Sequence, residues 1–90
     1  MTTVDQILTE RKSSHGNFTD HARITQNLKR VIDEELIGRM LRQQAPLSYT
    51  QKEAVDMILH KIGRVIAGDA SFDDHWIDIE GYAKIANGEK

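Results

Sequence analysis

The chain has 90 residues, a formal net charge of −2 and no cysteine. These values limit it to one small domain, exclude disulfide bridges and thiolate metal sites, and argue against binding nucleic acid, which requires a basic surface. Because the apolar runs are only a few residues long, no segment is expected to span a bilayer. We therefore expect a single domain over residues 1–90 that acts in the cytoplasm without a membrane partner.

Four helices are expected in chain order, near residues 4–13, 20–42, 50–67 and 72–87. Apolar residues in these segments recur every three or four positions, which is typical of one helix face. No stretch alternates apolar and polar residues as a half-buried strand would. Short loops favour antiparallel neighbours. The sequence therefore predicts an all-α fold, a compact antiparallel helical bundle of about four helices.

Side chains that can cap a helix N-terminus precede each segment. They are Thr3, Thr19, Ser48 or Thr50, and Ser71. Gly68 follows the third segment, and we expect it to end that helix in the left-handed conformation. Gly81 lies inside the fourth segment at a cost of about 1 kcal/mol relative to alanine, so we expect another backbone to pack closely against it.

The long second helix has more apolar residues than one neighbouring helix covers. A domain of this size also has a marginal core, and oligomerisation is a usual way to complete one. We therefore expect a homodimer or higher oligomer in which Ile32, Leu36, Met40 or their neighbours are buried between chains.

Two pairs of acidic residues fall on the third and fourth helices. Glu53 and Asp56 are three residues apart and Asp74 and Asp78 are four apart, so each pair shares a helix face. If the two helices pack side by side, the four carboxylates repel one another unless a cation lies between them, and Mg²⁺ prefers such oxygen ligands. The pattern is compatible with a Mg²⁺ site or with ordinary solvated side chains.

Asp78 has apolar neighbours in the sequence and needs a partner if it is enclosed. Lys61 and Arg64, on the preceding helix, can supply a structural salt bridge to it. Alternatively they hold a phosphate group, since arginine binds phosphate through two hydrogen bonds and lysine acts as a point charge. A second, looser basic group around the Gly16 turn consists of Arg11, Lys12, His15 and Arg23. His15 and His21 flank this turn, and they either line a pocket or are ordinary surface histidines.

The chain also resembles a family of small phage and prophage proteins. The resemblance rests on Arg11, His15-Gly16, Phe18, His21-x-Arg23-Ile24, Glu53-x-x-Asp56-Met57, Lys61, Arg64 and Asp74-x-Trp76-x-Asp78-Ile79-x-Gly81-Tyr82. Those proteins are in turn similar to the MazG-like, all-α nucleoside triphosphate pyrophosphatases.

The resemblance implies a nucleotide-binding protein, and a Mg²⁺-dependent hydrolase if the acidic set is catalytic. Glu53, Asp56 and Asp78 would then act in catalysis, and with Asp74 they would hold the metal. The substrate contacts would be Arg11, His15, Lys61, Arg64, Trp76 and Tyr82. The alternative is a non-catalytic oligomer that sequesters a nucleotide signal or binds a host protein to counter host defence. His15-Gly16-Asn17 in place of the family's Tyr-Gly-Asp turn favours this alternative.

Overall fold

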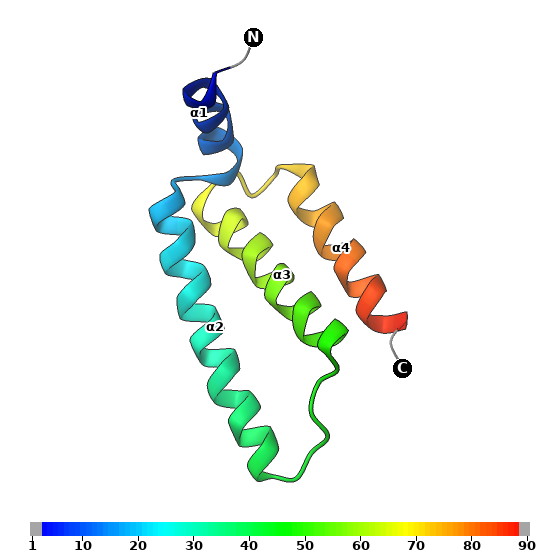
Figure 1. The fold of residues 1–90 in the computed structure, drawn as a ribbon. Coiled ribbons are helices and arrows are strands. Elements are labelled where there is room, and N and C mark those ends of the chain that lie inside the picture. Colours follow the sequence, from blue (N-terminus) through cyan, green and yellow to red (C-terminus); the bar gives the residue numbers. More distant parts are fainter. Residues whose placement is uncertain (1–2, 89–90) are drawn as a thin grey trace.

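The computed structural model describes residues 3–88, which form four helices (Figure 1). These are α1 (Val4–His15), α2 (Phe18–Leu41), α3 (Tyr49–Ala67) and α4 (Asp73–Gly88). No strand occurs among these residues. The predicted all-α fold is confirmed, and the predicted helix ends agree closely with the observed ones.

The central helix is α3, which lies between α2 and α4 with both neighbours antiparallel to it (Figure 1). Within residues 3–88, α2 and α4 do not contact each other. The short α1 projects from one end of this row and touches α2 and α3 (Figure 1). No helix in this part of the chain is long and apolar enough to cross a membrane.

The helix starts follow local side-chain hydrogen bonds. Thr3 and Gln6 form the predicted capping box of α1. For α3 the structure selects Ser48, whose hydroxyl accepts from the N–H of Gln51 while the Gln51 side chain accepts from the N–H of Ser48. The overlapping start at Thr50 is therefore not used.

Two predicted caps are wrong. The cap of α2 is Asn17 rather than Thr19, because the Asn17 side chain accepts from the N–H of Thr19 and starts the helix earlier. Ser71 does not cap α4, which begins at Asp73. The Ser71 N–H instead donates to the side chain of Asp69, which forms a turn between the helices.

The close helix contact lies at Gly63 rather than at the predicted Gly81. A Cβ atom at Gly63 would lie 2.3 Å from the hydroxyl oxygen of Thr25, so only glycine lets α2 approach α3 so closely. A Cβ atom at Gly81 would meet nothing within 4 Å among the described residues. The expectation of close backbone packing at Gly81 is therefore wrong within one chain.

The apolar core is small. Among residues 3–88, the fully buried apolar side chains are Ala54 and Leu59. The buried polar residues are His21, Thr25, Lys61 and His75. Of the residues expected between chains, Ile32 and Leu36 are half-buried, whereas Met40 is 66% exposed.

Candidate functional site

The end of α1 is fixed against the loop between α3 and α4. The carbonyl of Ser14 accepts hydrogen bonds from the N–H of Asp69 at 3.0 Å and from Nε2 of the buried His75 at 2.9 Å. Two donors on one carbonyl hold the last turn of α1 in place, and with it the side chains that this turn carries.

Two glycines bring the α1–α2 turn onto the end of α3. Gly16 has φ 80°, and a Cβ atom there would lie 2.2 Å from the carbonyl oxygen of Ala67. Gly68 ends α3 with φ −123°, so the predicted left-handed conformation is wrong. Glycine is needed at this position because a Cβ atom would lie 2.5 Å from the backbone nitrogen of Gly16.

A cavity of about 350 Å³ lies where α1, the α1–α2 turn and α3 meet. Its polar side chains are largely cationic or imidazole groups, and we call it the basic pocket. These side chains are Arg11, Lys12, His15, His21 and Arg64. Leu8 and Phe18 add an apolar edge, and Phe18 is 79% exposed.

The electrostatics of the basic pocket are those of crowded positive charge. Burial and the charges of Arg11 and Arg64 lower the pKa of His15 to about 4, so this imidazole is neutral near pH 7. Burial and the charge of Arg64 also lower the pKa of His21. The pKa of the Arg64 guanidinium is itself lowered by burial and then by Arg11.

No carboxylate lines the basic pocket among the described residues. The negative charge of Asp78 favours the charged form of Arg64. However, the Asp78 carboxylate forms its ion pair with Lys61 and not with Arg64. An anion entering the basic pocket would therefore relieve repulsion that the protein's own side chains leave uncompensated.

Asp78 is paired with Lys61, with 2.7 Å between the carboxylate Oδ2 and Nζ. Lys61 is buried, and the carboxylate satisfies its charge at the contact between α3 and α4. This hydrogen bond lowers the pKa of Asp78, and Arg64 lowers it further. The predicted salt bridge is present, so Lys61 and Arg64 do not act as a pair.

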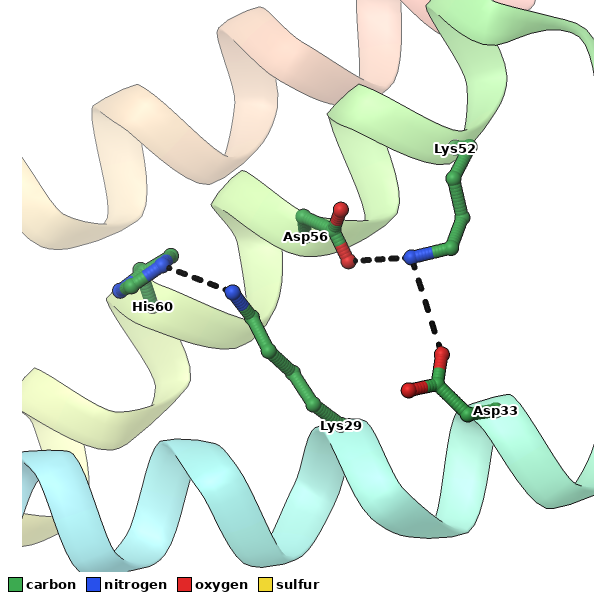
Figure 2. Close-up of polar contacts among 5 residues, drawn as sticks. All are labelled: Lys29, Asp33, Lys52, Asp56 and His60. Atoms are coloured by element: carbon green, nitrogen blue, oxygen red, sulfur yellow. Dashed lines mark hydrogen bonds and ion pairs between the residues drawn. The ribbon is translucent and has the colours of Figure 1, made fainter.

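Asp56 faces α2 rather than α4 (Figure 2). Its carboxylate lies 2.7 Å from Nζ of Lys52, and the same ammonium lies 3.9 Å from Asp33 on α2. One turn further along α3, Nζ of Lys29 donates to Nε2 of His60 at 3.2 Å (Figure 2). These polar contacts join α2 to α3, and they engage the carboxylate of Asp56.

The other predicted site residues lie apart from the basic pocket. Glu53 and Tyr82 line a second cavity of about 360 Å³ between the start of α3 and the end of α4. Asp74 is exposed in the first turn of α4. Trp76 is 52% exposed, and its Nε1 donates to the carbonyl of Ala70.

The four carboxylates proposed as Mg²⁺ ligands do not converge. Within residues 3–88, no three histidine, aspartate or glutamate side chains are grouped so as to hold a metal ion. Two of the four, Asp56 and Asp78, bond to lysine ammonium groups instead. As these residues lie, they do not fit a shared Mg²⁺ ion, and Mg²⁺ binding stays a prediction from the resemblance.

The structure thus brings together three of the predicted site residues, Arg11, His15 and Arg64, and adds two more. Lys12 and His21 were placed at the Gly16 turn by the sequence but were not among the predicted substrate contacts. Their signal in the sequence is closeness to Gly16, since a tight turn brings the side chains before and after it to one place.

Comparisons with known proteins identify a family whose function is not known. The chain matches no curated protein and no solved structure. The sequence profile of a family described as a domain of unknown function, DUF6378, matches residues 1–89. Because this match covers nearly the whole sequence, the chain belongs to the DUF6378 family.

Proposed function

We propose that the protein binds the phosphate groups of a nucleotide or nucleotide-derived small molecule in the basic pocket, without hydrolysing it. The observation that carries this proposal is the gathering of Arg11, Lys12 and Arg64 around one cavity that no carboxylate lines within residues 3–88. Guanidinium groups bind phosphate through paired hydrogen bonds, and lysine adds a point charge.

The two imidazoles suit the same ligand in a different way. Since its pKa is lowered to about 4, His15 is neutral near pH 7 and offers a hydrogen-bond donor without adding repulsion. His21 donates from Nε2 to the carbonyl of His60 at 3.1 Å, which fixes its ring at the pocket wall. The basic pocket therefore combines the positive charges of its arginine and lysine side chains with the imidazole rings of His15 and His21, and the His21 ring is held in place by a hydrogen bond.

The apolar edge of the basic pocket supports a nucleotide over a simple anion. A cavity of about 350 Å³ is at the small end of ligand sites, so it suits the phosphate groups and leaves the base outside. Phe18 stands exposed at this edge, and stacking of a base on an aromatic ring contributes about 1–3 kcal/mol. Phe18, rather than the predicted substrate contact Trp76, would thus lie against the base.

Hydrolysis is the second candidate, and it rests on the resemblance to MazG-like pyrophosphatases alone. It would require all four carboxylates to leave their present surroundings and to converge on Mg²⁺, namely those of Glu53, Asp56, Asp74 and Asp78. Binding requires no such rearrangement, which supports sequestration of a nucleotide over its turnover. The proposed phage origin and anti-defence role rest on the same resemblance.

Isothermal titration calorimetry with ATP and with inorganic pyrophosphate tests the binding proposal. The variant Arg64→Met keeps the apolar stem and removes the charge, and should weaken binding about tenfold to a hundredfold. Arg30→Met, which removes an exposed arginine elsewhere on α2, is the matched control and should bind like the wild type. Absence of binding by the wild type, or equal loss in both variants, would refute the proposal.

Pyrophosphate release from ATP in the presence of Mg²⁺ is measured on the same samples. Binding without release supports the non-catalytic form of the proposal. Release that disappears in Glu53→Gln would make the protein an enzyme and move the conclusion to the second candidate.

A further inference from the structure

One side of the helix row carries a continuous apolar surface. On α3, Val55, Ile62 and Ile66 are spaced by seven and four residues and form one stripe. Arg64 and His60 lie on the opposite stripe, since two residues along a helix correspond to about half a turn. Because α2 and α4 cover the two remaining sides of α3, each stripe faces one open side of the row.

The neighbouring helices extend both stripes. Lys29 and Asp33 of α2 bond to His60 and Lys52, which lie on or beside the stripe of α3 that carries Arg64. We call this side of the row the polar side. By helical spacing, Ile24 and Val31 of α2 face the side of the row that carries Ile62. On α4, Asp78 lies on the side of Arg64, and Trp76, two residues earlier, faces away from it. We call the surface formed by Ile24, Val31, Val55, Ile62, Ile66 and Trp76 the apolar face.

The apolar face is only partly covered by the chain itself, with Ile24, Val55 and Ile62 half-buried and the other three residues exposed. Val31 is 53% exposed, Ile66 65% and Trp76 52%. A soluble monomer rarely exposes so large a group of contiguous apolar side chains unless another surface covers them. The small internal core, with Ala54 and Leu59 as its fully buried apolar residues in the described chain, agrees with this.

The total surface is larger than that of a compact monomer, in part because no residue of α1 is buried. A folded monomer of 10.3 kDa exposes about 5,400 Å² by the usual scaling, whereas this chain exposes 6695 Å². The excess of roughly 1,300 Å² exceeds the ~800 Å² that each partner buries in a standard interface. The radius of gyration, 15.4 Å, is likewise larger than the ~12 Å expected for a domain of this length.

We infer that a second copy of the chain covers the apolar face in a two-fold symmetric dimer. Domains are built from two packed layers around one core, and this chain supplies one layer of helices. Two apolar faces match each other without any need for complementary charge, which suits a self-complementary two-fold interface. The basic pocket is built around Arg64 on the opposite stripe, so the dimer would leave it open.

Sedimentation equilibrium over a wide concentration range tests this inference. The wild type should have twice the chain mass of 10.3 kDa, and Ile66→Asp should reduce it to the chain mass. Met40→Asp is the matched control, since Met40 is equally exposed but lies seven residues from Asp33, on the polar side of α2. This control should leave the dimer intact.

A second variant guards against misfolding of the first. Val31→Asp places a charge on α2 in the apolar face and should also give the chain mass, with a helical circular dichroism spectrum. A wild type that is monomeric at every concentration would overturn the inference. So would a dimer that Met40→Asp dissociates while Ile66→Asp and Val31→Asp leave it intact.

Discussion

At the scale of single residues, the neutral histidines make stability depend on pH. The pKa of His15 is lowered to about 4 by burial, Arg11 and Arg64, whereas an unfolded histidine has a pKa near 6.5. Between these two values the unfolded chain binds more protons than the folded one. The contribution of His15 is therefore complete above pH 6.5 and is lost as the pH falls toward 4.

We predict that the free energy of unfolding falls between pH 7.5 and pH 5, and that His15 contributes to this decrease. The lowered pKa values of His21 and His60 add to the decrease in the same direction. Urea denaturation at a series of pH values measures the effect. His15→Gln should flatten the dependence, and an unchanged pH profile in this variant would contradict the assignment.

Substitution of two glycines by alanine tests the close contact between α2 and α3. Gly63→Ala places a methyl group against Thr25 and His21, which are both buried, and should lower the free energy of unfolding by about 1–3 kcal/mol. Gly81→Ala meets open space inside a helix and should raise it by about 1 kcal/mol. Denaturation of both variants in urea gives the comparison, and equal effects would contradict the described packing.

At the scale of elements, helical periodicity predicted α2, α3 and α4 because each buries part of one face against a neighbour. No residue of α1 is buried, and its start follows from the capping box of Thr3 and Gln6. The choice between Ser48 and Thr50 as the start of α3 could not be made, since both have a capping partner three residues later. The start at Asn17 was missed because Asn17 and Thr19 are both good N-cap residues two positions apart, and the sequence alone does not choose between them.

The contact between α3 and α4 depends on the pair of Lys61 and Asp78. Asp78→Asn leaves the buried ammonium of Lys61 without its carboxylate and should lower the melting temperature. The decrease should be the same with Mg²⁺ and with a chelator, because the lost partner is a lysine. A thermal melt of wild type and variant under both conditions measures this.

The same thermal melts also test whether the carboxylates bind Mg²⁺. If Mg²⁺ stabilises the wild type by mass action and Asp78→Asn removes that effect, the carboxylates do converge on a cation in solution. Such a result would contradict the structural role that the ion pair of Asp78 indicates.

At the scale of the whole molecule, spacing along a helix shows which residues share a face but not which neighbour that face meets. Glu53 and Asp56 were predicted to act together because they are three residues apart. However, α3 has helices on two opposite sides, so Asp56 turns toward α2 while Glu53 stays exposed near α4. The acidic set therefore divides along the two sides of one helix.

The basic pocket was partly predictable because some of its residues lie close together in the sequence. Arg11 and His15 lie close to the Gly16 turn in sequence, and a turn joins its two flanks whatever the tertiary arrangement. Arg64 could be brought there only by the contact between that turn and the end of α3. Local signals thus indicated half of the basic pocket, and the packing of Gly16 on Ala67 completed it.

The central claim is that phosphate binds in the basic pocket. The most direct test is a titration with ATP, in which nuclear magnetic resonance follows the chemical shifts of the backbone amides. The account predicts that the largest changes occur at residues 11–18 and at Arg64, with inorganic pyrophosphate moving the same amides except those around Phe18. It would be contradicted by shifts confined to the cavity of Glu53 and Tyr82, or by no shifts at all.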